Sequence, residues 1–309
     1  MAHGTHDHAD DPRNQEILIW VDGTLKPRAE AVVSVFDSGF VLGDGVWEGL
    51  RVHRGHPAFL ERHLDRLWQG AATLMIDIGM SRTELTRAIY QTLAANQMRD
   101  GVHVRLMVTR GVKSTPYQDP RVTVGPATVV IIAEHKEPMP ATVSEGITLF
   151  TTHVRRATPD TLDPKLNAHS KLNDITACIQ AYTAGADEAL MLDPHGFVAT
   201  CNSTHFFIVT PEGEVWTSDG RFCLGGITRG NVLDVCRAAG IQARETTFSL
   251  TDVYGAAEAF VTGTFAGLVP VRAVDGRTIG AGSRGPVVER LQGLYADHVT
   301  ADVADRVAP

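Results

Sequence analysis

The chain has 309 residues, of which 43% are hydrophobic and 21% are charged, and this composition excludes intrinsic disorder, collagen-like repeats and coiled coils. The 28 basic and 36 acidic residues give a formal charge of -8, which argues against nucleic acid as the main partner. No apolar run is long enough to cross a bilayer, and the 4 cysteines form no C-x-x-C pair, so we expect a cytoplasmic protein with reduced thiols.

Residues 1–14 carry charges but almost no apolar side chains and show no signal-peptide pattern, so we expect a mobile tail. The tail holds three histidines without a fixed geometry, for which we favour solvation over metal binding: His3, His6 and His8. Residues 16–21 then predict a strand. Asp22 and Gly23 form a tight-turn signal that folds the following residues back beside it.

The rest of the first half mixes helices and strands. Apolar residues recur at helical spacing over 60–76. Ser81 and Glu84 form a capping-box pattern, which predicts the start of a second helix. Strands are predicted at 103–109 and 128–133. Because these helices and strands do not alternate strictly, the pattern favours an α+β fold.

Two prolines with charged neighbours predict a linker over 137–144. We therefore expect a smaller N-terminal α+β domain at 15–136 and a larger C-terminal domain at 145–309. The elements predicted for the larger domain are a strand at 147–152, a helix at about 170–184, turns at 194–196 and 211–213, a helix from 227 to Gly240, a strand at 259–262, a turn at 275–276 and a helix at 286–298.

A glycine-rich segment, Leu224 to Arg229, runs directly into the start of a predicted helix. Free backbone amides at such a start make a phosphate cradle. A plain glycine-rich loop is an equally good interpretation of this segment alone. Gly263 and Thr264, after a predicted strand, form a second and weaker candidate phosphate loop.

Five ordered segments of the sequence form a pattern that is more specific than any one motif. They are Val35-Phe36-Asp37-Ser38-Gly39-Phe40 with Gly43 to Arg51, His63-Leu64-Asp65-Arg66-Leu67, Gly225 to Arg229, Val261-Thr262-Gly263-Thr264, and Pro270-Val271. In order and spacing they resemble the class IV pyridoxal-phosphate aminotransferases over about residues 17–295. Within that class the resemblance is to the branched-chain, D-amino-acid and (R)-amine aminotransferases and to aminodeoxychorismate lyase.

This resemblance implies a two-domain fold of type IV, with a β-barrel-like C-terminal domain flanked by helices and pyridoxal 5'-phosphate between the domains. It also implies a homodimer. The expected reaction moves an amino group from an amino acid or amine, most closely a branched-chain donor, to a 2-oxo acid through a lysine aldimine.

The resemblance assigns the cofactor phosphate to Arg66, to the helix-start residues Ile227 and Thr228, and to Thr264. A guanidinium on a helix suits bidentate phosphate binding. Arg62 lies on the same predicted helix as a competitor that the motif does not select.

The family lysine that bonds the cofactor normally precedes an asparagine by seven residues. Here Lys165 lies eight residues before Asn173, and Lys171 is a rival near the start of the following helix. We favour Lys165, because it lies on the approach to that helix after a proline that fixes the backbone.

Two positions depart from the family pattern. Thr200 stands where the family has a glutamate that pairs with the pyridine nitrogen, and His205 replaces an asparagine. A threonine offers only a neutral hydrogen bond. A lyase of the same fold, or a non-catalytic protein that binds pyridoxal phosphate or another metabolite, therefore stays open as an alternative.

Substrate contacts are implied at His103 and Arg105, on one predicted strand, and at Trp47. An arginine there suits the carboxylate of an amino donor or an oxo acid. An outward-facing arginine and a core tryptophan are the competing interpretations. No glycines of a nucleophile elbow surround Ser203, and no His/Cys spacing supports a metal site.

Overall fold

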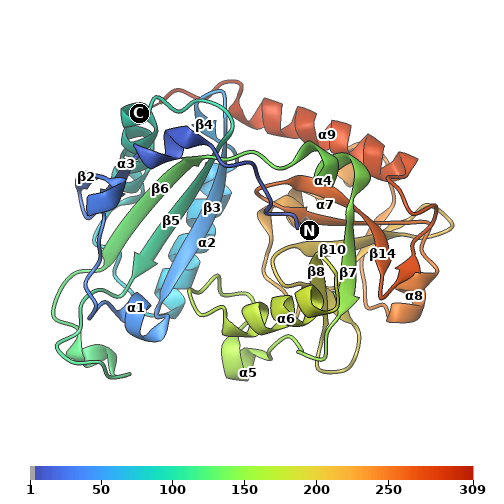
Figure 1. The fold of residues 1–309 in the computed structure, drawn as a ribbon, viewed down its shortest axis with the longest axis horizontal. Coiled ribbons are helices and arrows are strands. Elements are labelled where there is room, and N and C mark those ends of the chain that lie inside the picture. Colours follow the sequence, from blue (N-terminus) through green and yellow to red (C-terminus); the bar gives the residue numbers. More distant parts are fainter. Residues whose placement is uncertain (1–3, 309) are drawn as a thin grey trace. The chain divides into compact units, whose positions relative to one another are not determined.

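The computed structural model describes residues 4–308, which divide into two compact units (Figure 1). The amino-terminal unit contains residues 10–137, 166–171 and 299–308. The carboxy-terminal unit contains residues 4–9, 138–165 and 172–298. The sequence placed a boundary at 137–144, and the chain passes between the units after Glu137, but each unit also takes short segments that a linear division does not predict.

The amino-terminal unit is built on one antiparallel sheet in the order β2-β1-β6-β5-β3-β4. Its strands are β1 (Leu18–Val21), β2 (Thr24–Pro27), β3 (Gly45–His53), β4 (His56–Pro57), β5 (Val102–Thr109) and β6 (Thr128–His135). The hairpin predicted at Asp22 and Gly23 is confirmed, and both residues have the positive φ, 47° and 91°, that such a turn requires.

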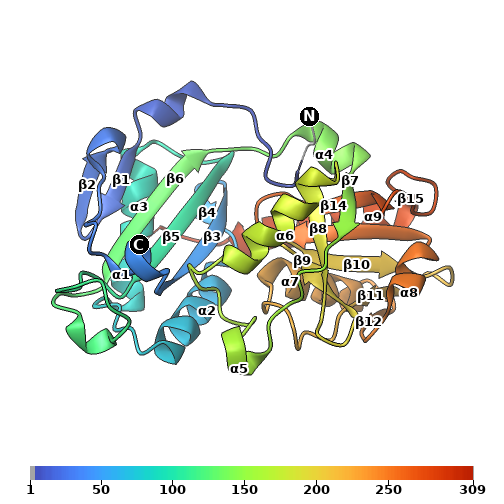
Figure 2. The same ribbon diagram turned by 60° about the horizontal axis from the view of Figure 1, so that its bottom comes forward.

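Helices α2 (Leu60–Thr73) and α3 (Arg82–Ala95) cover one face of this sheet (Figures 1 and 2). The capping box predicted at Ser81 is present at the start of α3. Burial alternates along β5, so every second side chain packs under the helices and the others, including His103 and Arg105, lie on the opposite face. We call this opposite face the open face of the sheet. The remaining helical segments of the unit are η1 (Pro12–Gln15), η2 (Arg28–Glu30), α1 (Ser38–Leu42) and η3 (Pro120–Val122).

The carboxy-terminal unit holds a mixed sheet in the order β12-β11-β10-β13-β14-β7-β8-β9, with β15 paired to β14. Its strands are β7 (Ile147–Thr151), β8 (Glu188–Leu192), β9 (Val198–Cys201), β10 (His205–Val209), β11 (Val215–Thr217), β12 (Ala243–Glu245), β13 (Glu258–Gly263), β14 (Gly267–Val274) and β15 (Arg277–Thr278). Only residues 202–204 connect β9, at one end of this order, to β10 near the other end, so the sheet curls round on itself. The α+β prediction is confirmed.

The helices of this unit are α4 (Pro140–Glu145), α5 (Pro159–Leu162), α6 (Leu172–Thr183), α7 (Ile227–Ala238), α8 (Leu250–Tyr254) and α9 (Pro286–Val303). Both faces of β10 are buried, since Phe206 packs with Phe248 on one side and Phe207 stacks on Phe260 at 4.8 Å on the other. In the part of the chain that the structure describes, no helix is long and apolar enough to cross a membrane.

The structure differs from the expectation for two irregular segments. The segment predicted as a linker contains α4, because Pro140 occupies the first helical turn, where its missing N–H costs nothing. The predicted mobile tail packs on the protein from Gly4 onward: the Thr5 side chain is 2% exposed, and Asn14 pairs with the backbone of His135. The composition of the segment does not indicate this packing, because single polar contacts hold the segment in place. His3 lies outside the described residues.

Candidate active site

The predicted phosphate loop of the carboxy-terminal unit ends at Gly226, which lies at the N-cap of α7 and gives no side-chain cap. The first amides of α7 have no acceptor within the helix, because the helix starts there. A Cβ atom built at Gly225 would meet no atom within 4 Å, so open space lies beside the loop. Open amides and the positive end of the helix dipole together form a site for an anion.

His205 lies directly against this loop. A Cβ atom at Gly226 would come within 2.3 Å of the His205 ring, so only glycine fits there. The His205 Nε2 atom is also 2.7 Å from the carbonyl oxygen of Leu224. His205 therefore fixes the path of the chain into α7, a role that the sequence did not reveal.

Thr264 and Thr200 belong to the same unit. Thr264 is half-buried in the turn between β13 and β14. Thr200 is buried on β9, and its hydroxyl donates to the carbonyl oxygen of Thr204 at 2.8 Å. The proton of the Thr200 hydroxyl is thus already used, and the oxygen retains lone pairs that can accept a hydrogen bond.

In the amino-terminal unit, a buried charge cluster joins β3 to α2. The carboxylate of Glu48 accepts from Nε and Nη2 of Arg66, each at 2.7 Å, and lies 2.6 Å from Nδ1 of His63. Burial alone would raise the pKa of Glu48, but hydrogen bonding and charge from Arg66, with a further contribution from His63, hold it below its ordinary value. Burial lowers the pKa of His63. An ionised Glu48 therefore holds the Arg66 guanidinium in a bidentate pair.

A second cluster lies on the open face of the sheet. The Arg105 guanidinium stacks over the Trp47 ring at 4.0 Å, and the Lys171 Nζ is 5.7 Å from the same ring centre. His103 lies on the same face, close enough to Gly49 that a Cβ there would be 3.2 Å from its ring. Burial lowers the pKa of Arg105, against the attraction of Glu134, but a guanidinium stays charged at neutral pH. This face therefore presents two cations and an aromatic ring, a combination that suits a carboxylate ligand.

The two candidate lysines have different surroundings. Lys165 is exposed, and its backbone N–H donates to Asp163 Oδ1 at 2.9 Å. Lys171 is half-buried, with Nζ 3.5 Å from the side-chain oxygen of Asn167. Asn167 is itself held by its amide, which donates to the Trp47 carbonyl oxygen at 2.6 Å. Burial thus favours Lys171, whereas sequence spacing favoured Lys165.

The structure groups the predicted site residues as follows. Ile227, Thr228, Thr264 and Thr200 belong to the carboxy-terminal unit, whereas Trp47, His103 and Arg105 share the open face of the amino-terminal sheet. Arg66 is directed to Glu48, on the helix-covered side of that sheet. Glu48 was not predicted from the sequence as a site residue. It could have been selected, because it is the only charged residue among the apolar side chains and glycines of 45–50.

Comparison with known proteins gives consistent results. The profile of the family described as "Amino-transferase class IV" matches residues 45–274. The chain is 41% identical over 284 residues to branched-chain-amino-acid aminotransferase-like protein 2 of Arabidopsis thaliana, covering 92% of this chain but about half, 50%, of that relative's length. It is 39% identical over 281 residues to a putative branched-chain-amino-acid aminotransferase of Methanocaldococcus jannaschii, covering 90% and 95% of the two chains. A crystal structure of the T.th. branched-chain amino acid aminotransferase, complexed with N-(5'-phosphopyridoxyl)-L-glutamate, superposes with a TM-score of 0.84 at 29% identity, covering 93% and 95%.

Proposed function

The chain belongs to the class IV aminotransferase family, and we propose that it is a pyridoxal-phosphate-dependent transaminase. In this proposal it moves an amino group from an amino acid or amine, with branched-chain-like donors preferred, to a 2-oxo acid. The observation that carries the proposal is the uncapped start of α7 beside the open space at Gly225, because it fits a phosphate group. The names of the relatives, and the phosphopyridoxyl adduct of the solved structure, support the same substrate class.

We assign the cofactor's phosphate to the amides of Ile227 and Thr228 and to Thr264. The uncapped start of α7 and the contact of His205 with the loop support this assignment. Arg66 is assigned to the same phosphate by the family resemblance, and its pair with Glu48 fixes the guanidinium before any ligand arrives. When bound, pyridoxal phosphate supplies an electron sink for the carbon that loses its proton.

The chain's own residues carry the remaining roles. One lysine, Lys165 by sequence spacing or Lys171 by burial, would hold the cofactor through its Nζ atom. Once the amine of the donor takes its place on the cofactor, the freed Nζ would move the proton. Arg105 binds a substrate carboxylate, and the Trp47 ring lies against the same guanidinium and limits its movement. His103 borders this carboxylate site on the open face.

The second candidate function is a lyase of the same fold, and Thr200 motivates it. If the ring nitrogen of the cofactor faces Thr200, the hydroxyl would accept a hydrogen bond from it without the charge of a carboxylate, since its own proton is donated to Thr204. The ring would then be a weaker electron sink, and transamination would be slower. For this reason elimination is kept as the second candidate reaction.

Amino-donor screening tests the proposed function. Purified protein loaded with pyridoxal phosphate is incubated with branched-chain, D- and aromatic amino acids and amines, with 2-oxoglutarate or pyruvate as the acceptor. We expect oxo products from the donor and amino products from the acceptor in equal amounts. Ammonia without an amino product would favour the lyase, and no turnover of any donor would contradict both enzyme functions.

Replacing Arg105 by alanine should raise the KM for dicarboxylic oxo acids by at least about tenfold, since a charge-assisted bidentate pair contributes roughly 1.5–3 kcal/mol. The dissociation constant of pyridoxal phosphate should change little, because the phosphate loops lie in the other unit and Arg66 lies on the opposite side of the sheet from Arg105. Steady-state kinetics with 2-oxoglutarate and equilibrium cofactor titration provide the two measurements. An unchanged KM for every acceptor would remove Arg105 from the substrate site.

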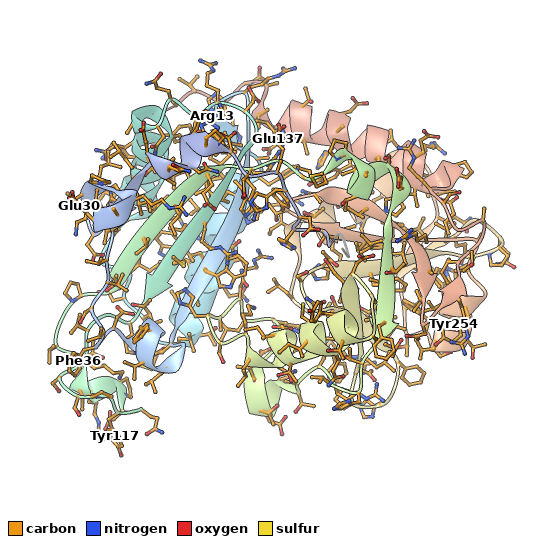
Figure 3. All side chains as sticks on the ribbon, in the orientation of Figure 1. Arg13, Glu30, Phe36, Tyr117, Glu137 and Tyr254 are labelled. Atoms are coloured by element: carbon orange, nitrogen blue, oxygen red, sulfur yellow. The ribbon has the colours of Figure 1, made fainter. Side chains whose placement is uncertain are left out.

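A homodimer is part of the proposal. Helix α6 leaves an apolar stripe exposed at helical spacing: Leu172, Ile175, Ile179 and Tyr182. Phe36, seen at the margin of the amino-terminal unit in Figure 3, belongs to a second exposed apolar segment at 32–42. We assign these surfaces to a second copy of the chain.

Sedimentation analysis tests this assignment. We expect the wild-type protein to sediment as a dimer and Ile179→Glu to shift it towards the monomer, because the substitution places a charge in an apolar contact. Val307→Glu is the control, since Val307 is an exposed apolar side chain that belongs to neither of these two surfaces. A monomeric wild type, or a dimer insensitive to Ile179→Glu, would contradict the assignment.

The proposed location is the cytoplasm, and the four cysteines, all free thiols in the structure, agree with a reducing compartment. Fractionation of cells that express the full protein tests this location. Recovery with membranes or in a secreted fraction would contradict it.

A further inference from the structure

A buried carboxylate lies beneath the phosphate loops of the carboxy-terminal unit. Glu188, the first residue of β8, is 3% exposed. None of the ion pairs formed within residues 4–308 joins it to an arginine or a lysine. Its oxygens accept from three hydroxyls instead. Ser203 Oγ lies 3.1 Å from Oε1, Thr204 Oγ1 lies 2.7 Å from Oε2, and the Thr5 hydroxyl donates to Oε1. A buried carboxyl group without a cation beside it depends on its hydrogen-bond donors, so each of them matters.

Two of the three donors adjoin the residues that form the phosphate site. Thr204 immediately precedes His205, whose ring supports Leu224 and Gly226. The Thr204 methyl group would lie 3.3 Å from a Cβ atom at Gly263, the residue before Thr264. Glu188 thus holds a turn that touches both candidate phosphate loops.

The third donor comes from the far N-terminus. Both the hydroxyl and the backbone N–H of Thr5 hydrogen-bond to Glu188. The neighbouring His6 stacks on Phe265, which follows Thr264, with ring centres 5.9 Å apart and planes at 18°. Thr5 and His6 also line one small pocket together with Thr204, Gly263 and the Phe265 ring. The N-terminal segment therefore contacts the second phosphate loop and the carboxylate beneath it.

We infer that Thr5 and His6 are positioning residues for the cofactor phosphate, acting through Glu188, Thr204 and Phe265. This inference rests on the proposed function, since it assigns a support to the phosphate site of that function. The segment 4–9 acts as a brace: Thr5 fixes the 203–205 turn through the carboxylate, and His6 fixes the 263–265 turn by stacking. A preorganised cradle binds its anion more tightly than a loose one.

The test measures pyridoxal phosphate binding by the full-length protein after Thr5→Val. This substitution keeps the shape of the side chain but removes the hydroxyl that the buried carboxylate accepts. We expect the dissociation constant to rise by about tenfold, which is the effect of losing one hydrogen bond of a buried polar group. The phosphorus NMR signal of the bound phosphate should also shift and broaden, since its donors are less fixed.

Two further variants separate positioning from general stability. Thr5→Ser keeps the hydroxyl and should restore the wild-type affinity. Thr92→Val removes an equally buried hydroxyl, which donates to Ala88 inside α3 of the other unit, and should leave cofactor binding unchanged. His6→Ala should weaken binding in the same direction as Thr5→Val, because it removes the stack on Phe265.

The possible outcomes distinguish this inference from the proposed function. If the wild type binds pyridoxal phosphate and Thr5→Val binds it equally well with an unchanged phosphorus signal, the brace is wrong and the proposed function stands. If Thr92→Val weakens binding as much as Thr5→Val, the effect is general destabilisation and the brace is again wrong. If the wild type itself binds no pyridoxal phosphate, the proposed function fails first.

Discussion

Borohydride reduction of the cofactor-loaded protein is expected to fix the cofactor on a single lysine of the segment 165–171. Trypsin then identifies which one, because it does not cleave after a modified lysine. A tag on Lys165 leaves residues 157–171 as one peptide, whereas a tag on Lys171 leaves residues 166–221 uncut. Mass spectrometry separates these two products without reference to activity.

Replacing the tagged lysine by alanine should lower kcat at least about a hundredfold, since a positioned acid-base group contributes roughly 10²–10⁴-fold. The other lysine is the matched control and should keep most of its kcat; if it is Lys171, the loss of that cation from the open face is expected in KM instead. Lys165 has the support of sequence spacing, and Lys171 has that of half-burial beside Asn167 and Trp47. A tag outside both positions, or an unchanged kcat in both variants, would contradict the assignment of the catalytic lysine to this segment.

Most elements with a local signal were predictable. The α3 start depends on Ser81 and Glu84 alone, and the first hairpin depends on Asp22 and Gly23, so both could be identified within a few residues of sequence. The start of α7 at Ile227 followed from the glycines before it. Elements whose structure depends on neighbouring residues could therefore be predicted from the sequence alone.

Strand β3 shows why other elements were missed. Its helix-covered face carries the charged Glu48 and its open face carries the aromatic Trp47, so polar and apolar residues do not alternate regularly along the sequence. Such a strand lacks the two-residue periodicity that identifies a half-exposed strand. Strand β10 lacks this periodicity for another reason, since it is buried on both sides.

Only part of the site was predictable, because a local pattern identifies a residue but not the partner that it contacts. Single residues such as Arg66 and Arg105 could be selected from their motifs, but their partners could not. Glu48 contacts Arg66 across 18 positions of sequence, and Thr5 contacts Glu188 across 183. Such pairs depend on how strands and helices pack, and no local pattern contains that information.

Replacing Glu48 by glutamine should produce the largest loss of stability among these variants, on the order of 3–5 kcal/mol, because removing one partner of a buried ion pair leaves the other charge uncompensated. The Arg66 side chain is only 13% exposed, so water replaces the lost carboxylate poorly. Urea unfolding at neutral pH measures the change. Asp65→Asn on the same helix is the control, since Asp65 pairs with Arg82 at the surface and such pairs contribute about 0–1 kcal/mol.

The difference between the wild type and Glu48→Gln should also depend on pH. The pKa of Glu48 lies below its ordinary value of 4.5 in the folded protein, so the folded state favours the ionised carboxylate. The stability that this group contributes is present above pH 4.5 and is lost as the pH falls through the lower, folded-state pKa. The two proteins should therefore converge in stability at acid pH, where protonation of Glu48 has the same effect as the amide. A difference that stays constant with pH, or one no larger than that of Asp65→Asn, would show that the Glu48–Arg66 pair does not stabilise the amino-terminal unit, and that the guanidinium is held in place by other contacts of α2.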